Sequence, residues 1–208
     1  MIDDKIILKT VDSIQTSMDD ASVINCQLSL LQNVLPQEAI DKLQSLVINP
    51  TVSWSKVDHQ KSLNRHSITW LSDSVIEELH IACEKLTDSI KQYYDIDNIK
   101  LQALQLWNDG KGYSMGSHQD NPVIDVAMQI YLFEDRKNEG TTFFVGDQII
   151  EVPFKKNSAY LLWKKSNSER IPHQPTSNIS TNGRYSLYIT WSRFGKQAPD
   201  ANDPAAFL

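Results

Sequence analysis

Short segments rich in β-branched and aromatic residues follow one another through the second half of the chain, and no helix-like segment separates them. They span residues 101–107, 123–133, 141–145, 149–152, 159–163 and 184–191. Turn-forming residues such as Gly146, Pro153 and Gly183 stand between them. Strands in such a series need a second sheet to cover their apolar faces, so the pattern predicts a sandwich or barrel.

Two segments in the first half have the periodicity of amphipathic helices. The first opens at Pro36-Gln37-Glu38, where a proline suits the first turn and an acid suits the helix dipole. The second begins near Asp73, a good N-cap. Their apolar stripes are Ala39, Ile40, Leu43, Leu46 and Val47, and Val75, Ile76, Leu79, Ala82, Leu86 and Ile90. Both stripes predict packing against a core. Further short strands are expected over 26–31, 52–57 and 67–71.

These elements predict one domain of the α+β class, mainly β, over all 208 residues. Residues 1–98 would supply N-terminal strands and supporting helices, residues 99–194 the β core, and residues 195–208 a tail. Apolar residues at 40% and charged residues at 22% are typical of a globular protein that buries its own core.

Charge and cysteine usage exclude several functional classes. The 26 acidic residues outnumber the 20 Lys and Arg and give a net charge of −6, which argues against a nucleic-acid partner gripped through phosphates. Cys26 and Cys83 lie far apart and form no zinc or disulfide pattern, so reduced thiols are expected. The acidic start of the sequence and the absence of a long apolar run predict a cytoplasmic protein that makes no membrane contact.

The candidate chemistry begins at Ser117-His118-Gln119-Asp120. On a strand, residues i and i+2 point to the same face, so His118 and Asp120 would present an imidazole and a carboxylate together, with Gln119 facing away. Such a pair is weak evidence alone, because a surface hydrogen-bonded pair has the same sequence. With a further histidine it completes the two-His, one-carboxylate set that holds Fe(II), and His173 is the candidate.

A possible anion clamp follows His173 on the last β segment. Arg184, Ser186, Tyr188 and Thr190 alternate along that segment and share one face. An arginine and a hydroxyl there could hold a carboxylate, and a buried arginine without such a partner would be costly. Trp191 falls on the opposite face, which predicts that it packs in the core.

The order of a His-x-Asp pair, a distant histidine and a following arginine resembles the iron(II)- and 2-oxoglutarate-dependent dioxygenases, and within them the prolyl 4-hydroxylase type. The resemblance covers roughly residues 99–194 and extends to several flanking motifs. They are Gly110-Lys111-Gly112-Tyr113, Asp120-Asn121-Pro122, Gln129-Ile130-Tyr131-Leu132 and Glu139-Gly140-Thr141-Thr142-Phe143. It implies a double-stranded β-helix, a relative of the jelly roll, with helices packed outside.

The resemblance also implies residue roles. It assigns His118, Asp120 and His173 as ligands of Fe(II), and Arg184 as the partner of the distal carboxylate of the cosubstrate 2-oxoglutarate. Tyr131 matches a tyrosine that hydrogen-bonds the same carboxylate in some prolyl hydroxylases. Ser186 completes an Arg-x-Ser pattern seen in other branches of the family, and both residues are expected to contribute to binding 2-oxoglutarate. Substrate contacts are expected from three residues in the loops around the first ligands: Asn108, Tyr113 and Asn121. The implied reaction consumes O2 and 2-oxoglutarate, releases succinate and CO2, and hydroxylates a C–H bond.

The sequence leaves the substrate open. A prolyl or other amino-acid residue in a peptide or protein is the first hypothesis, and a free amino acid or other small metabolite is the alternative. A catalytically silent jelly-roll binding module is a third. Departures from the closest pattern, Trp107-Asn108-Asp109 and Glu139-Gly140, fall where substrate is shaped. The polar stretch 59–66 is either a lid or a solvated loop, and the oligomeric state is left open.

Overall fold

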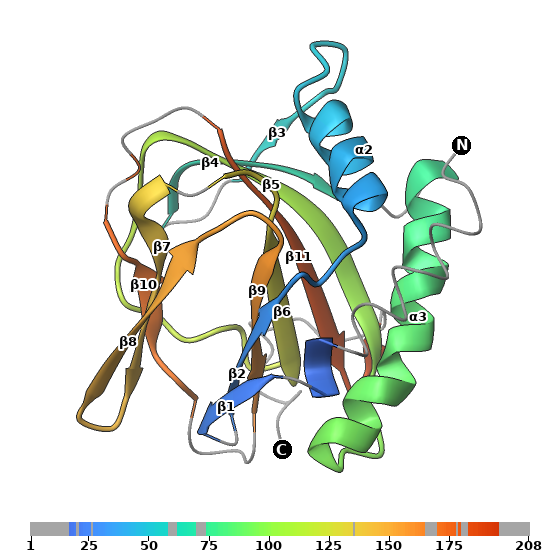
Figure 1. The fold of residues 1–208 in the computed structure, drawn as a ribbon, viewed down its shortest axis with the longest axis vertical. Helices are drawn as coiled ribbons and strands as arrows, with labels where there is room; N and C mark the ends of the chain where they lie inside the picture. The colour runs from blue at the N-terminus through green and yellow to red at the C-terminus, as the bar shows by residue number, and fades with distance from the viewer. Residues whose placement is uncertain are drawn as a thin grey trace.

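The structure is a computed structural model that describes residues 17–19, 21–25, 27–57, 62–69, 74–134, 136–164, 170–177, 179 and 183–195. The expectations placed on Cys26, His59, Asp73 and the tail beyond residue 195 lie outside these residues. Within them, the chain forms two antiparallel sheets that face each other, so the mainly β architecture predicted from the sequence is confirmed (Figure 1).

The larger sheet has eight strands and the smaller sheet has three. In spatial order the larger sheet contains β1 (Ser22–Asn25), β2 (Leu28–Gln32), β9 (Ser158–Trp163), β6 (Val126–Tyr131), β11 (Arg184–Ser192), β5 (Lys100–Met115), β4 (Ser62–Thr69) and β3 (Ser55–Lys56). The smaller sheet contains β10 (His173–Pro175), β7 (Arg136–Val145) and β8 (Gln148–Phe154). The N-terminal strands β1 and β2 therefore extend the same sheet as the β core.

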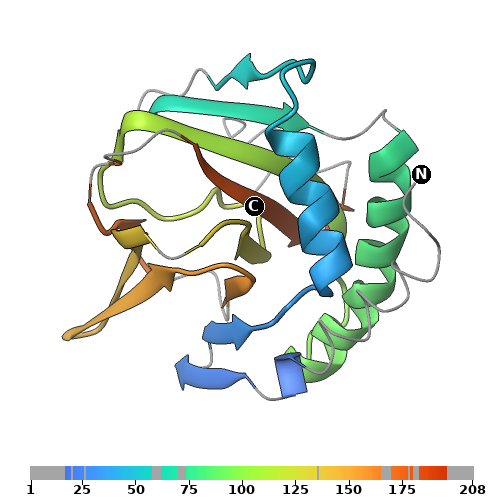
Figure 2. The same cartoon turned by 45° about the horizontal axis from the view of Figure 1, so that its top comes forward.

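Two helices cover the outer face of the larger sheet, on the side away from the smaller one (Figure 2). They are α2 (Gln37–Val47), which starts directly after Pro36 as predicted, and α3 (Ser74–Tyr94). Their apolar faces join the outer sides of β5, β6 and β11 in one buried cluster. Trp191 lies in this cluster, completely buried, and donates a hydrogen bond from Nε1 to Oγ1 of Thr87 at 3.1 Å, which confirms its predicted core position. No described helix is long and apolar enough to cross a bilayer.

A second apolar cluster fills part of the space between the two sheets. It includes Leu28, Tyr131, Phe143, Phe154 and Tyr160. Alternation along β6 and β11 sends successive side chains to the helix side and to this inner side, which is how one sheet supplies two cores.

The structure corrects two predictions about β4 and β5. The stretch predicted as a loop up to residue 66 is strand from Ser62 onward, paired with β5. β5 also continues through Gly110 and Gly112, beyond the end of the β segment predicted over 101–107. The pairing shifts register between Leu63 and Arg65, and Gly112 takes φ +80° beside the bulge, a conformation that glycine adopts without strain.

Candidate metal centre and its cavity

A pair of backbone hydrogen bonds brings the two predicted histidine ligands together. The His118 amide donates to the His173 carbonyl at 3.0 Å, and the His173 amide donates to the His118 carbonyl at 2.8 Å. His173 opens β10, whereas His118 lies beyond the end of β5. The sequence predicted that His118 and Asp120 lie on one face of a strand. This prediction is wrong, because neither residue belongs to a strand. An isolated bridge from the segment after β5 to the first residue of β10, rather than alternation along one strand, places the first ligand.

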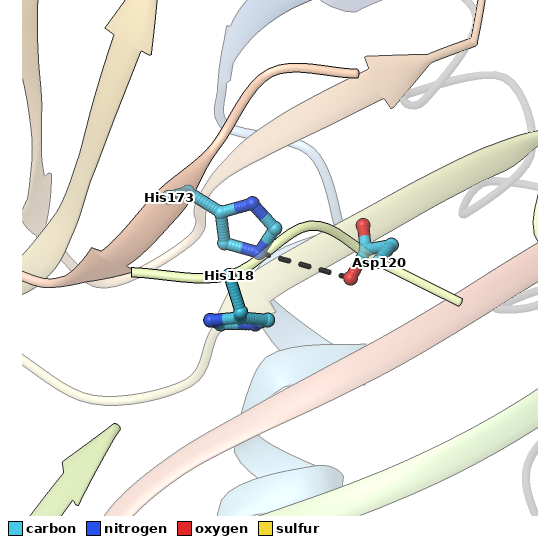
Figure 3. A group of neighbouring side chains, drawn as sticks. All are labelled: His118, Asp120 and His173. Atoms are coloured by element: carbon cyan, nitrogen blue, oxygen red, sulfur yellow. Dashed lines mark ion pairs between the residues drawn. The ribbon is translucent and has the colours of Figure 1, made fainter. Parts of the chain in front are cut away.

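The side chains of His118, Asp120 and His173 lie beside one another, which is the grouping that the sequence predicted (Figure 3). Their ligand atoms all lie within 4.8 Å of one another, and the imidazole centroids are 4.4 Å apart. Nε2 of His173 lies 3.7 Å from Oδ1 of Asp120, beyond the usual hydrogen-bond range. Among the described residues, this is the group whose donors are arranged to hold a cation.

Backbone carbonyls fix the orientation of both imidazoles. Nδ1 of His118 lies 3.0 Å from the Gly116 carbonyl, and Nδ1 of His173 lies 3.3 Å from the Ile171 carbonyl. A carbonyl can only accept, so each Nδ1 carries the proton and each Nε2 keeps its lone pair for a metal. Burial, and then the neighbouring His173, lower the pKa of His118 to about 4, so this imidazole is neutral near pH 7.

Two aromatic residues support Asp120 from the cavity side. The Tyr188 hydroxyl donates to Oδ1 of Asp120 at 3.4 Å, and the Tyr188 ring stacks on Trp107 with centroids 4.0 Å apart. Burial, followed by the negative charge of Asp120, holds the pKa of Tyr188 well above its usual value. The hydroxyl therefore stays protonated and remains a donor to the carboxylate.

The three donors lie on the wall of a partly open cavity between the two sheets. The other lining residues come from β4, β5, β6, β7, β9, β10 and β11 and are mostly polar or aromatic. They are Arg65, Trp107, Tyr113, Met115, Gln129, Thr141, Tyr160, Gln174, Pro175, Arg184 and Tyr188. One cavity thus joins the donor triad to two arginines.

Arg184 is buried at the cavity wall, with 1% of its surface exposed. Nε donates to the Glu139 carbonyl at 2.7 Å, and Nη2 lies 3.3 Å from both the Gly140 carbonyl and Oγ1 of Thr141. Nη1 donates to Oδ2 of Asp109 at 2.6 Å. The sequence predicted that Arg184 binds the distal carboxylate of 2-oxoglutarate. In the structure, one of its N–H groups already binds a carboxylate of the chain itself, that of Asp109.

Asp109 also pairs with a second arginine from β4. Nε and Nη2 of Arg65 donate to the two carboxylate oxygens of Asp109 at 2.6 Å and 3.0 Å. Arg65 stacks over the rings of Trp107 and Tyr113, with its guanidinium carbon 3.8 Å and 4.7 Å from their centroids. Trp107, Asp109 and Arg65 were not predicted as site residues.

The two guanidinium groups stay charged. Burial alone lowers the pKa of Arg65, but the attraction of Asp109 and Tyr113 outweighs it, and the net pKa is raised. Burial likewise lowers the pKa of Arg184, and Tyr131 and Asp109 more than offset it. Two positive groups then face one buried carboxylate, so this end of the cavity carries a surplus positive charge.

The remaining predicted site residues divide by position. Tyr113 lines the cavity, and its hydroxyl donates to Sδ of Met115 at 3.5 Å. Tyr131 and Ser186 are completely buried behind the lining, Tyr131 bonded to Oγ1 of Thr141 at 2.6 Å and Ser186 to Nε2 of Gln129 at 2.7 Å. Asn108 and Asn121 are not among the lining residues, and Asn121 instead accepts from the Val123 amide.

The unforeseen residues could have been found only through strand register. Arg65 pairs with Asp109 on β4 and β5, and Asp109 pairs with Arg184 on β5 and β11. The available signal was one acid, Asp109, and two arginines, Arg65 and Arg184, in separate parts of the sequence. That signal has no fixed spacing in sequence, so it became informative only when the strand order was known.

By sequence alone, neither a protein-family model nor a curated protein matches the chain. Solved structures match by shape. A prolyl hydroxylase from Trichoplax adhaerens, in complex with a peptide fragment of the oxygen degradation domain of hypoxia inducible factor, is 14% identical, with a TM-score of 0.65 over 94% of this chain and 92% of that one.

A Pseudomonas putida prolyl-4-hydroxylase is also 14% identical, with a TM-score of 0.63 over 86% of this chain and 97% of that one. The non-heme, alpha-ketoglutarate-dependent epimerase SnoN of nogalamycin biosynthesis is 10% identical, with a TM-score of 0.60 over 88% of this chain and 82% of that one. At such identities the similarity shows the fold, which is the double-stranded β-helix expected from the sequence.

Proposed function

We propose that this chain is an Fe(II)- and 2-oxoglutarate-dependent oxygenase that hydroxylates a C–H bond. The overall reaction combines substrate, 2-oxoglutarate and O2 into hydroxylated substrate, succinate and CO2. One observation carries the proposal: two imidazole nitrogens and one carboxylate converge on the wall of a cavity that also contains surplus guanidinium charge. A metal site and an anion site in one small cavity suit a chelating dicarboxylate.

The donor set fits Fe(II). His118, Asp120 and His173 would hold the ion as a two-His, one-carboxylate triad, which leaves coordination positions open for other ligands. When bound, such an ion supplies the redox chemistry with O2 and binds the 2-oxo acid. The hydrogen bonds from Nδ1 of the two histidines keep their Nε2 atoms available, and the Tyr188 hydroxyl orients Asp120.

Arg184 is proposed to attract the distal carboxylate of 2-oxoglutarate. Tyr131 acts on this arginine through Thr141, because the Thr141 hydroxyl contacts both the Tyr131 hydroxyl and Nη2 of Arg184. Ser186 acts through Gln129, whose Oε1 also accepts from the Tyr160 hydroxyl at 2.6 Å. Both predicted helpers thus support the cavity wall, and neither is among the lining residues.

The proposed substrate is an amino-acid residue of a peptide or protein, prolyl as the first choice. Two prolyl hydroxylases of similar fold support this choice, and one of them holds a peptide. A small-molecule substrate is the second candidate, supported by the similar fold of SnoN. A silent binding module stays a third, and it differs from both because it would bind without turnover.

The first experiment tests the reaction class. Purified protein is mixed with Fe(II) and then 2-oxoglutarate without oxygen, and we expect the weak visible charge-transfer band of an iron–2-oxo acid chelate. The same mixture with Zn(II) is the matched control and should show no band. A folded protein that binds Fe(II) and gives no band on addition of 2-oxoglutarate would contradict the proposal.

The second experiment separates the substrates and the silent module. Peptide and amino-acid panels are incubated with Fe(II), 2-oxoglutarate and air, and products are read by mass spectrometry for a gain of one oxygen atom. Succinate that rises only with one class of compound identifies that class. A chelate band without oxygenated product, and without substrate-dependent succinate across both panels, would favour the binding module.

A further inference from the structure

We propose that Arg65 is a second anchor for the distal carboxylate of 2-oxoglutarate, held in place by Asp109, and that this anchor sets the preference for a dicarboxylate. The inference deepens the proposed function and rests on it. It assigns a ligand-binding role to a residue of β4, a strand outside the segment that carries the metal ligands and Arg184.

Arg65 keeps more hydrogen-bond donors free than Arg184 does. A guanidinium carries five N–H groups. Arg184 already makes hydrogen bonds to the Glu139 and Gly140 carbonyls, to Thr141 and to Asp109. Arg65 uses only Nε and one edge of Nη2, both toward Asp109. Within the described part of the chain, Nη1 of Arg65 has no hydrogen-bond partner.

The free donors of Arg65 lie at the cavity. Arg65 lines the same cavity as the donor triad and Arg184. Trp107 and Tyr113 contact the faces of its guanidinium, which directs the unused donors along the plane of the group rather than toward either ring.

The charges of the cluster around Asp109 do not balance. Arg65, Arg184 and Asp109 together leave one positive charge in a buried cluster, and side-chain exposure does not exceed 10% for any of the three. A buried charge that lacks a partner is expensive, so a bound carboxylate would stabilise the cluster. Asp109 meanwhile occupies one edge of each arginine and keeps both from moving into the space that the ligand needs.

The test compares two ligands that differ only at the far end. 2-Oxopentanoate has the chain length and 2-oxo acid group of 2-oxoglutarate but lacks the distal carboxylate. Full-length protein is loaded with Mn(II) under argon, and the affinity for each acid is measured by calorimetry, so no turnover is involved. The measured quantity is the ratio of the two dissociation constants, compared between the wild type and the variants.

We expect the wild type to prefer 2-oxoglutarate and Arg65→Gln to reduce this preference by about tenfold or more, the usual worth of a hydrogen bond to a charged group. The affinity for 2-oxopentanoate should change little. Arg65→Lys keeps the positive charge but loses the paired N–H donors of the guanidinium. Its preference for 2-oxoglutarate should lie between that of the wild type and that of Arg65→Gln. Arg193→Gln removes an arginine whose side chain is 49% exposed and pairs with Asp125, and it should leave both affinities unchanged.

The failures are distinguishable. If the wild type binds 2-oxoglutarate selectively and both Arg65 variants keep that selectivity, the inference is wrong and the proposed function stands. If both acids weaken equally in Arg65→Gln and in Arg65→Lys, Arg65 is structural only and the inference is again wrong. If the Mn(II)-loaded wild type binds neither acid, the proposed function is overturned and the inference with it.

Discussion

Oδ2 of Asp109 accepts a hydrogen bond from Nη1 of Arg184 at 2.6 Å, and neither side chain is more than 2% exposed. The same carboxylate holds Arg65 through both of its oxygens. Replacing it by the isosteric amide leaves two buried guanidinium groups without a counter-charge. We expect Asp109→Asn to lower the free energy of unfolding by about 3–5 kcal/mol, measured by urea denaturation.

The matched control for this variant is Asp88→Asn. Asp88 pairs with Lys91 at 3.8 Å on the surface of α3 and is 88% exposed, so its loss should change stability by less than about 0.5 kcal/mol. Equal effects of the two substitutions would show that the buried carboxylate contributes no more than a surface one.

His118→Ala and Asp120→Ala should each remove most of the affinity for divalent metal, because each deletes one of three converging ligands. Binding of Mn(II), followed by electron paramagnetic resonance of the free ion, measures this without any assay of turnover. Gln119→Ala is the control, since Gln119 lies between the two ligands and donates to the Arg170 carbonyl instead. Substrate-coupled succinate formation retained in either ligand variant would contradict the proposed metal site.

Tyr131→Phe tests whether the Tyr131 hydroxyl contacts 2-oxoglutarate directly or acts on Arg184 through Thr141. The variant loses the hydrogen bond to Thr141 and leaves a buried hydroxyl with fewer partners, so stability should fall by about 1 kcal/mol. Because Tyr131 is not among the lining residues, we expect the affinity for 2-oxoglutarate to fall by less than about threefold. A much larger loss would mean that the hydroxyl contacts the ligand directly.

Gly140→Ala should destabilise the smaller sheet. A Cβ at this position would lie 1.9 Å from the Val152 carbonyl oxygen, so β7 and β8 would have to separate. We expect a loss of about 2 kcal/mol or more in the free energy of unfolding. Gly116→Ala is the matched control, because a Cβ there meets nothing within 4 Å, and its stability should stay close to the wild-type value.

Stability should fall as the pH rises above about 9. Burial raises the pKa of Cys83 from 9.0 to about 12 and that of Tyr113 from 10.0 to about 12. In this window the unfolded chain releases protons that the folded chain keeps, so alkali favours unfolding. Urea midpoints at pH 8 and pH 10.5 measure the slope, and Tyr113→Phe should make it shallower. An unchanged midpoint over this range would contradict the assigned burial.

The sequence predicted those parts of the molecule that depend on local pattern. The start of α2 after Pro36, the series of β segments and the core position of Trp191 all follow from periodicity and turn residues. His118, Asp120 and His173 were identified because three residue types occurred in the order that the resemblance required. The structure brings these three side chains together, and their role as metal ligands stays a prediction.

The rest depended on pairings between distant residues. Arg65 and Asp109 are 44 positions apart, and Asp109 and Arg184 are 75 apart. The polar residues around Arg65 predicted a loop. Local propensity cannot show that β5 lies beside this segment and supplies a buried partner for Arg65. The bulge at Arg65 and the extension of β5 through Gly112 likewise follow from tertiary pairing and not from the letters themselves.

The reciprocal amide-to-carbonyl contacts between His118 and His173 have a consequence for how the protein handles its ion. Because these contacts are backbone hydrogen bonds, the two histidines come together when the chain folds, whether or not a cation is bound. A chelator should therefore remove a bound metal and leave a folded apoprotein that can bind metal again. Small zinc domains, in contrast, unfold when they lose their metal. Exchange of one ion for another at the proposed metal site would then require no refolding. The ion bound in a cell would depend on which metals are available and on their preferred coordination.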